Sequence, residues 1–245
     1  MIKSLSIIFP IYNEESRLNA SIKHIESFLK KEKKLNLELI FVDDGSTDQS
    51  FKIIKEFIKN YKLKKKRKIK LIQVKSNRNI GKGSALKLGV KRASCEWILT
   101  ADIDISVTLF QIIIWIKKKY ITSEKKVYFG SRRHEKSILQ TKAYRRILGV
   151  IFSLFADLIL NIKIFDTQCG YKLYKKSVAK FIFSKLNSFG FVHDLELVLL
   201  LNSKNIGITE LPIKWKHKDN SRLNIIFDPI KMFIGIIAIR LRGIK

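Results

Sequence analysis

Short apolar runs alternate along the chain with longer stretches in which apolar residues recur every three or four positions. The runs predict buried β-strands at residues 5–9, 37–42, 69–74, 96–101 and 127–130. Between the first two runs, Leu18, Ile22, Ile25 and Leu29 have the spacing of a helix that packs on a sheet through one face. This alternation predicts an α/β protein whose mostly parallel sheet is flanked by helices on both faces.

The second half of the chain continues the pattern less regularly. We expect a strand at residues 171–174, a helix near residues 191–201 and a strand at residues 206–213, followed by a polar loop containing Trp215 and His217. Pro10 is expected to end the first strand. The lysine-rich residues 62–70 are expected to form a basic loop.

Two acids, Asp102 and Asp104, follow the apolar residues 97–99 and are spaced as Asp-x-Asp. Because alternate residues of an extended chain point to the same side, both carboxylates are expected to face one divalent cation. Mg²⁺ and Mn²⁺ take oxygen ligands and bind through one or two carboxylates together with substrate phosphates. The pair therefore suggests a metal held against a diphosphate, with an ordinary polar turn as the alternative.

Polar residues also follow two other predicted strands, at residues 10–14 and 43–48. Ligands of parallel α/β sheets bind outside the carboxyl ends of the strands. These clusters and the acidic pair are therefore expected to meet at one edge of the sheet. Gly81 and Gly83 precede a predicted helix, and we expect their backbone N–H groups to hold an anion. Their spacing is not that of a Walker loop.

Two strongly apolar helices are expected in the C-terminal half, at residues 142–162 and after Asp228-Pro229. The first has one polar stripe, and the second ends at Arg240 and Arg242. The second helix is about 21 Å long for about 14 residues, shorter than the ~30 Å hydrocarbon core of a bilayer. Both helices are expected to lie in a membrane interface, although residues 142–162 would also suit a core helix.

The formal net charge of +28 favours polyanionic partners: nucleic acid, anionic lipid or phosphorylated substrates. A nucleic-acid-binding protein would interleave aromatic residues with arginines. The basic residues 62–70 contain no aromatic residue, so no nucleic-acid partner is expected. The charge and the apolar helices together favour an anionic membrane surface.

Seven motifs in order along the chain resemble those of the inverting family 2 glycosyltransferases of GT-A fold. They are FPIYNEE (9–15), VDDGSTD (42–48), NIGKGSA (79–85), ADID (101–104), GSR (130–132), DTQCGYKLY (166–174) and WKHKDNSR (215–222). The resemblance covers roughly residues 4–225. The DTQCGYKLY and WKHKDNSR motifs are the most specific, and they resemble those of the dolichyl- or polyprenyl-phosphate β-glucosyltransferases.

The resemblance implies a UDP-sugar pocket formed by Pro10, Tyr12, Glu14, Asp43, Asp44, Lys82 and Asp102. One of Asp43 and Asp44 would accept the uracil N3–H and the other would lie near the ribose, in an order that the sequence leaves open. Asp102 and Asp104 would coordinate Mg²⁺ or Mn²⁺ on the UDP phosphates. Lys82 would add positive charge near the same diphosphate.

The resemblance also implies an acceptor site for polyprenyl phosphate. Arginine grips phosphate through paired N–H groups, and Arg132 is the first candidate. The other acceptor-phosphate candidates are Arg145, Arg146, Ser221 and Arg222. Asp166 would orient the sugar or the attacking oxygen, and with Arg132 and Asp194 it is a catalytic candidate. Asp194, with Glu196 nearby, stands where related enzymes carry an acidic pair that contacts the sugar hydroxyls.

We therefore expect a catalytic domain at residues 1–224, including the interfacial helix 142–162, and a membrane-associating amphipathic helix at residues 225–245. The expected activity is transfer of a hexose, glucose from UDP-glucose, to a dolichyl or undecaprenyl phosphate at the cytoplasmic face of the cell membrane. Alternatives are another donor such as GDP-mannose, a saccharide acceptor, a nucleotide-binding regulator without turnover and, most remotely, a basic nucleic-acid-binding protein.

Overall fold

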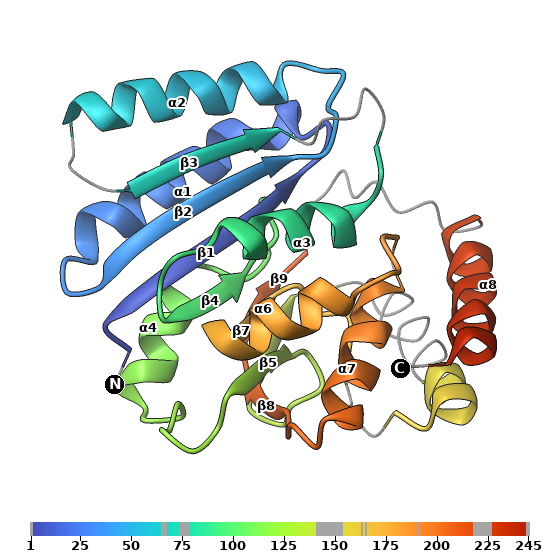
Figure 1. Ribbon diagram of the computed structural model, residues 1–245. Coiled ribbons are helices and arrows are strands. Elements are labelled where there is room, and N and C mark those ends of the chain that lie inside the picture. The colour runs from blue at the N-terminus through green and yellow to red at the C-terminus, as the bar shows by residue number, and fades with distance from the viewer. Residues whose placement is uncertain are drawn as a thin grey trace.

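A sheet of seven strands forms the centre of the computed structural model, with helices on both faces (Figure 1). The structure describes residues 2–64, 68–73, 79–140, 154–162, 164, 166–190, 192–217 and 227–243, and their side chains except at 62–64, 68–73 and 227–231. The strand order is β3-β2-β1-β4-β7-β5-β8. The prediction of an α/β fold with helices on both faces is confirmed.

The first half of the chain alternates strands and helices as the apolar spacing predicts. The parallel strands are β1 (Ser4–Ile11), β2 (Asn36–Asp43), β3 (Lys68–Gln73) and β4 (Trp97–Thr100). Between them lie the helices α1 (Glu15–Lys31), α2 (Ser50–Lys64) and α3 (Lys82–Arg92). The predicted basic loop at 62–70 is therefore wrong for most of its length, because α2 continues to Lys64 and β3 begins at Lys68.

The second half inserts one antiparallel strand into this parallel sheet. Strand β7 (Lys172–Lys175) pairs with β4 on one side and with β5 (Val127–Ser131) on the other. Strand β8 (Thr209–Pro212) then lies parallel to β5, and a small second sheet pairs β6 (Ile138–Gln140) with β9 (Lys214–Lys216). The helices are α4 (Phe110–Lys117), α6 (Lys176–Lys185), α7 (His193–Ser203) and α8 (Phe227–Arg242).

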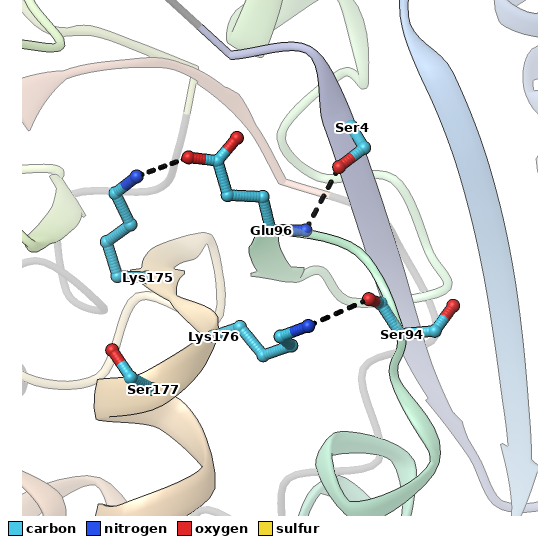
Figure 2. Close-up of a pocket in the computed structure, with 6 residues that line it drawn as sticks. All are labelled: Ser4, Ser94, Glu96, Lys175, Lys176 and Ser177. Carbon is cyan, nitrogen blue, oxygen red and sulfur yellow. Dashed lines mark hydrogen bonds and ion pairs between the residues drawn. The ribbon is translucent and has the colours of Figure 1, made fainter.

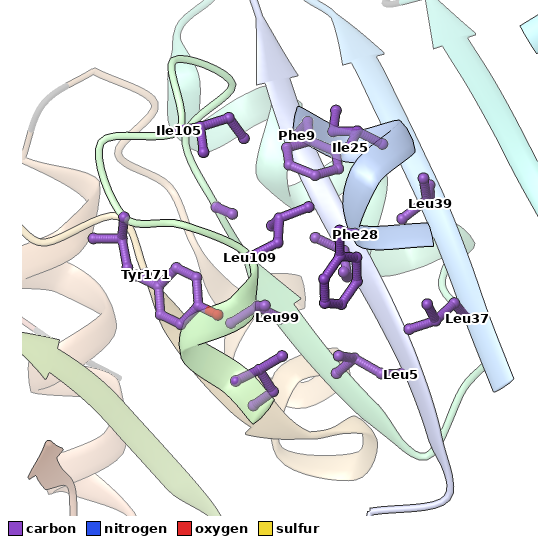
Figure 3. Packing of buried hydrophobic residues seen from close by; sticks show 14 of the residues in the cluster. Leu5, Phe9, Ile25, Phe28, Leu37, Leu39, Leu99, Ile105, Leu109 and Tyr171 are labelled. Carbon is purple, nitrogen blue, oxygen red and sulfur yellow. The ribbon is translucent and has the colours of Figure 1, made fainter. Parts of the chain in front are cut away.

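Alternate residues of β1 feed two separate hydrophobic cores. Leu5 and Phe9 point toward α1 and α4, where they meet Phe28 and Leu109 (Figure 3). Ile8 points the other way, into the cluster formed with α3, α6 and α7. A strand buried on both faces reads as a continuous apolar run, which is why residues 7–9 of β1 are apolar without alternation.

Pro10 does not end β1, which continues to Ile11. The carbonyl of Ile8 accepts a hydrogen bond from Ala101, so alternate residues of β1 direct their backbone groups toward β4. The missing N–H of Pro10 therefore faces the side on which β4 has already ended at Thr100. Proline is tolerated here because it removes no ladder hydrogen bond.

The apolar helices of the C-terminal half fall partly within the described residues. Residues 154–160 are helical, and the rest of the predicted 142–162 helix up to residue 153 lies outside the description. Helix α8 begins at Phe227, one residue before the predicted cap, and buries Ile236 and Ile239 in the second core. Among the described residues, no helix combines the length and apolar character needed to cross a bilayer.

A pocket of about 430 Å³ opens at the amino edge of the sheet, opposite the predicted site (Figure 2). It is lined by Ser4, Ser94, Glu96, Lys175, Lys176 and Ser177. Lys175 is paired with Glu96 and Lys176 donates to the carbonyl of Ser94, so its cations are engaged within the protein. None of the site residues predicted from the sequence lines this pocket.

Replacing Gly89 with alanine should destabilise the protein by up to about 2 kcal/mol. A Cβ atom there would lie 2.5 Å from Cγ2 of the buried Ile8, and overpacking of this kind costs about 1–3 kcal/mol, more than the ~1 kcal/mol gained in helix propensity. Gly207→Ala is the matched control, because no atom lies within 4 Å of its added Cβ. Urea unfolding measures both variants, and equal midpoints would contradict the close packing of α3 on β1.

Candidate active site

The carboxyl edge of the sheet gathers the polar clusters that follow β1, β2 and β4. The segments after β1 and β2 are joined directly: Asn13 accepts a hydrogen bond from the Thr47 N–H at 2.7 Å, and its own N–H donates to Ser46 Oγ at 2.9 Å. Asn13 has a φ of +52°, a left-handed conformation that asparagine tolerates. The predicted convergence of these loops is confirmed.

Asp43 and Asp44 end β2 with different surroundings. Asp44 accepts hydrogen bonds from the N–H groups of Gly81 at 2.7 Å and Ile80 at 3.4 Å, so it fixes the start of α3. Burial raises the pKa of Asp44, with Asp43 contributing and the two backbone bonds opposing. Asp43 is fully buried, and its Oδ1 has no hydrogen-bond partner among the described residues. Asp43 therefore holds the acceptor oxygen that remains available to a ligand.

The two glycines at the start of α3 serve a different purpose from the predicted one. Gly81 has a φ of +126°, and its N–H donates to Asp44, whereas the Gly83 N–H donates to the carbonyl of Phe189 at 2.8 Å. A Cβ atom at Gly81 would lie 2.3 Å from that carbonyl oxygen. The expectation that these amides hold an anion is wrong, because protein acceptors already occupy them.

Asp102 is paired with Lys82 from the first turn of α3, at 2.6 Å. Burial disfavours the charged ammonium, but the Asp102 carboxylate outweighs it and holds the pKa of Lys82 above its usual range. A Cβ atom at Gly170 would lie 2.3 Å from Asp102 Oδ2, so only glycine fits there. Lys82 and Asp102 thus lie together as predicted, and Gly170 is a further site residue whose role the sequence did not reveal.

Asp104 lies in a turn beyond the end of β4, so the argument from alternation along an extended strand does not apply to this pair. Its Oδ1 accepts the Ser106 N–H at 2.9 Å, and its Oδ2 lies 3.6 Å from Arg17 Nη1. Arg17 also binds both carboxylate oxygens of Glu14, at 2.7 and 2.6 Å. Arg17 therefore joins the predicted nucleoside residue Glu14 to the metal pair, a link that helical spacing alone could not identify.

Arg132 and Asp166, both predicted as catalytic residues, bind each other. The Arg132 backbone N–H and Nε donate to Asp166 Oδ2, and Nη2 donates to Oδ1, each at 2.8 Å. Although burial favours the neutral acid, Arg132 holds the pKa of Asp166 below its usual value. The ring of Trp215 lies over the guanidinium, with its centroid 5.9 Å from Arg132 Cζ. Asp166 is thus engaged by Arg132, which turns one edge of its guanidinium toward the carboxylate.

Asp194 stands at the start of α7 beside a lysine that the sequence analysis missed. Lys172 on β7 is 1% exposed and forms an ion pair with Asp194, and His193 Nε2 lies 3.2 Å from the same carboxylate oxygen. Burial would raise the pKa of Asp194, but His193 and Lys172 outweigh it and hold the pKa well below its usual range. In the sequence, a lysine within a short predicted strand does not indicate that it pairs with Asp194.

Glu196, expected beside Asp194 near the sugar hydroxyls, is engaged within the protein. Its buried carboxylate accepts the N–H groups of Ser188 at 2.6 Å and Asn187 at 3.2 Å, and it pairs with Arg242 of α8 at 2.8 Å. Tyr12 is exposed at the carboxyl edge, and Pro10 is partly buried beside it in sequence. Arg145, Arg146, Ser221 and Arg222 lie outside the described residues.

The donor set of Asp102 and Asp104 fits a hard divalent cation. Among the side chains that the structure describes, no group of three or more His, Cys, Asp or Glu residues could hold a metal by itself. Two carboxylates are nevertheless what Mg²⁺ takes from a protein when substrate phosphates complete its coordination. The residues present therefore suit a metal that binds together with a diphosphate.

Residues 6–183 match the model of glycosyl transferase family 2. The chain belongs to this family. It is 32% identical to the dolichyl-phosphate β-glucosyltransferase of Dictyostelium discoideum, over 97% of this chain and 74% of that protein. It is also 32% identical to the dolichyl-phosphate β-glucosyltransferase of Homo sapiens, over 98% of this chain and 76% of that protein.

This family 2 glycosyltransferase shares its fold with solved structures. Glucosyl-3-phosphoglycerate synthase from Mycobacterium tuberculosis superposes with a TM-score of 0.67 at 17% identity, over 97% of this chain and 80% of that one. The same enzyme in complex with Mn²⁺, UDP-glucose and phosphoglyceric acid gives a TM-score of 0.67 at 18% identity, over 98% of this chain and 79% of that one. The predicted GT-A fold and glycosyltransferase class are confirmed.

The stabilisation from the Arg132–Asp166 pair should disappear in acid. A lowered folded pKa means that the carboxylate stabilises the protein above the unfolded value of about 4 and ceases to do so as pH falls through the folded value. Asp166→Asn should cost about 2 kcal/mol at pH 7, and this difference from the wild type should shrink below about pH 4. Thermal unfolding from pH 7 to 2.5 measures it.

Asp157→Asn is the control for this pH series, because Asp157 is exposed. It should follow the wild-type curve throughout. A difference between wild type and Asp166→Asn that stays constant down to pH 2.5 would contradict the lowered pKa.

Proposed function

We propose that this glycosyltransferase moves glucose from UDP-glucose to a polyprenyl phosphate, with inversion at the anomeric carbon. The observation that supports the proposal is the layout of the carboxyl edge. The Oδ1 of Asp43, without a partner among the described residues, the Lys82–Asp102 pair and the Arg132–Asp166 pair lie at the carboxyl ends of β2, β4 and β5. Similarity over 97–98% of this chain to two proteins named dolichyl-phosphate β-glucosyltransferase supports a glucosyl group and a polyprenyl phosphate acceptor.

Asp43 is our candidate for the nucleobase, because its Oδ1 is a buried acceptor without a partner. Such an oxygen carries a desolvation cost that a ligand N–H, such as that of uracil N3, would remove. Asp44 is committed to the start of α3 and would act by holding that helix in place. Pro10 and the exposed ring of Tyr12 would line the same nucleoside pocket.

Asp102 and Asp104 would hold Mg²⁺ or Mn²⁺, which offsets the negative charge that grows on the UDP leaving group. The paired cation Lys82 lies beside Asp102 and would contribute to the same charge balance. A bound diphosphate would compete with Asp102 for the ammonium, and Gly170 leaves the carboxylate room beside it. These residues would therefore bind the diphosphate of the donor, which leaves as part of UDP.

The acceptor phosphate is already ionised near neutral pH, so it can attack the anomeric carbon with little help from a general base. Its approach to an anionic donor requires positive charge, and Arg132 supplies it. Asp166 holds the guanidinium by one edge, which leaves Nη1 to face a phosphate. Arg145, Arg146, Ser221 and Arg222 remain candidates for the same anion, and Asp194 remains one for the sugar hydroxyls.

Among the alternatives, GDP-mannose is the nearest, because a carboxylate acceptor can also receive the N–H groups of guanine. A saccharide acceptor would not need the charge of Arg132. Family membership disfavours both a regulator without turnover and a nucleic-acid-binding protein.

Incubating the full chain with Mn²⁺, polyprenyl phosphate and radiolabelled UDP-glucose should transfer label into the lipid phase, and GDP-mannose should transfer little. Asp104→Asn should reduce transfer by about 100-fold or more, because a metal ion stabilises the developing charge by several kcal/mol. Glu26→Gln, which removes an exposed carboxylate on α1, should transfer normally. Label entering lipid only from GDP-mannose would overturn the donor assignment, and normal turnover of Asp104→Asn would remove the metal role.

We also propose that the enzyme lies on the cytoplasmic face of a membrane. Leu154, Leu158, Ile234, Ile237 and Leu241 are large apolar side chains that are 49–83% exposed on α8 and the 154–160 helix. The two helices are joined by Phe155 and Phe233, whose ring centroids lie 3.9 Å apart. An apolar face on a chain of net charge +28 complements the anionic lipids of the cytoplasmic leaflet.

Replacing Ile234 and Leu241 with serine should weaken binding to phosphatidylglycerol–phosphatidylcholine vesicles by about tenfold or more, because each buried side chain of this size contributes roughly 1.5–3 kcal/mol. Both residues are exposed, so the fold should be retained. Ile138→Ser removes an exposed apolar residue of β6 and should not affect binding. Co-sedimentation measures all three proteins, and undiminished binding by the double variant would exclude this face.

A further inference from the structure

Residues 186–190, which connect α6 to α7, lie against the start of α3. The carbonyl of Phe189 accepts the Gly83 N–H at 2.8 Å, and a Cβ atom at Gly83 would lie 2.7 Å from the carbonyl oxygen of Ser188. The segment therefore forms one wall of the first turn of α3, which carries Lys82. In Figure 1 it rises beside that end of α3, on the side that faces α8.

The same segment is held from its other side by α8. Glu196, whose side chain is 2% exposed, accepts the N–H groups of Asn187 and Ser188 through its two oxygens. Arg242 of α8 supplies the cation, with Nη2 2.8 Å from Glu196 Oε1 and 3.4 Å from Ser188 Oγ. A buried carboxylate without such a cation is strongly unfavourable, so Arg242 offsets the cost of burying Glu196 and holds its side chain in place.

A second contact between α8 and this region is independent of charge. The backbone of α8 approaches Val192 so closely that a Cβ atom at Gly235 would lie 2.6 Å from Val192 Cγ1. Val192 directly precedes α7 and is buried with Ile236 and Ile239 of α8. Two contacts, about two helical turns apart on α8, thus fix the segment that supports α3.

We propose that α8 is a positioning element of the donor site, with Arg242 acting through Glu196 and residues 187–190 on the first turn of α3. The effect on the reaction is indirect. Arg242 contacts Glu196 and Ser188, which support the start of α3, whereas Lys82 on α3 is the residue that would face the donor. The proposal rests on the proposed function in one respect: it takes a UDP-sugar as the donor that this turn of α3 receives.

Arg242→Gln should weaken binding of UDP in the presence of Mn²⁺ by roughly 2- to 30-fold, the range found for side chains that couple two sites. Isothermal titration calorimetry on the full chain measures the dissociation constant. Arg240→Gln is the matched control: it removes the same charge from the same turn of α8, but Arg240 is exposed and the Glu196 carboxylate is paired with Arg242 instead. It should bind UDP as the wild type does.

Hydrogen–deuterium exchange separates local coupling from general destabilisation. Arg242→Gln should accelerate exchange in residues 81–86, where the Gly83 N–H is bound to Phe189, and leave β1 and β2 unchanged. Gly235→Ala should produce the same local change without altering charge. Arg242→Lys should restore part of the UDP affinity, and it serves as the deciding variant if Arg242→Gln fails to fold.

The outcomes are distinguishable from failure of the proposed function. If the wild type binds no UDP with Mn²⁺, the UDP-sugar assignment is wrong, whereas the exchange measurement still tests the coupling. If the wild type binds UDP, and the Arg242 and Gly235 variants bind it as tightly as Arg240→Gln with unchanged exchange at residues 81–86, the positioning role of α8 is overturned.

Discussion

Carboxylates at the carboxyl edge of the sheet are held by cations that come from other elements of the fold. The reaction proposed here brings an anionic donor to an anionic acceptor, so the site needs positive charge, yet an unpaired buried cation is costly. Pairing resolves this conflict, because each carboxylate offsets the charge of its cation and fixes the direction of the side chain. The pairs between elements are Asp102 with Lys82, Asp166 with Arg132 and Asp194 with Lys172, and Glu14 binds Arg17 locally at the start of α1.

The sequence predicts the part of this arrangement that depends on the spacing of apolar residues and on the polar residues that follow each strand. The apolar runs locate β1 to β5, and the helical spacing of Leu18, Ile25 and Leu29 identifies the buried face of α1. The polar clusters converge because parallel strands share one carboxyl edge. Helix α6 was not predicted, and β9 places Trp215 in a strand rather than a loop.

The partners of the site residues could not be predicted, because pairing depends on tertiary contacts. Asp43 and Asp44 are chemically identical in the sequence, and only the approach of α3 distinguishes them. In the sequence, the glycines at 81 and 83 suit either an anion site or a close backbone contact. The structure shows the close contact, because the backbone of residues 188–190 lies against both glycines. Lys172 and Arg17 gain their importance from neighbours 22 and 87 positions away, Asp194 and Asp104.

The antiparallel strand β7 imposes an order on how the molecule can assemble during translation. It separates β4 from β5, so the edge of β4 that faces away from β1 and the facing edge of β5 stay unpaired until residue 175 has left the ribosome. The four N-terminal strands contact one another without it, and with them the acids after β1, β2 and β4 can gather early. Arg132 meets Asp166 only once the later half has been made, so the loops after β1, β2 and β4 can come together before the Arg132–Asp166 pair forms.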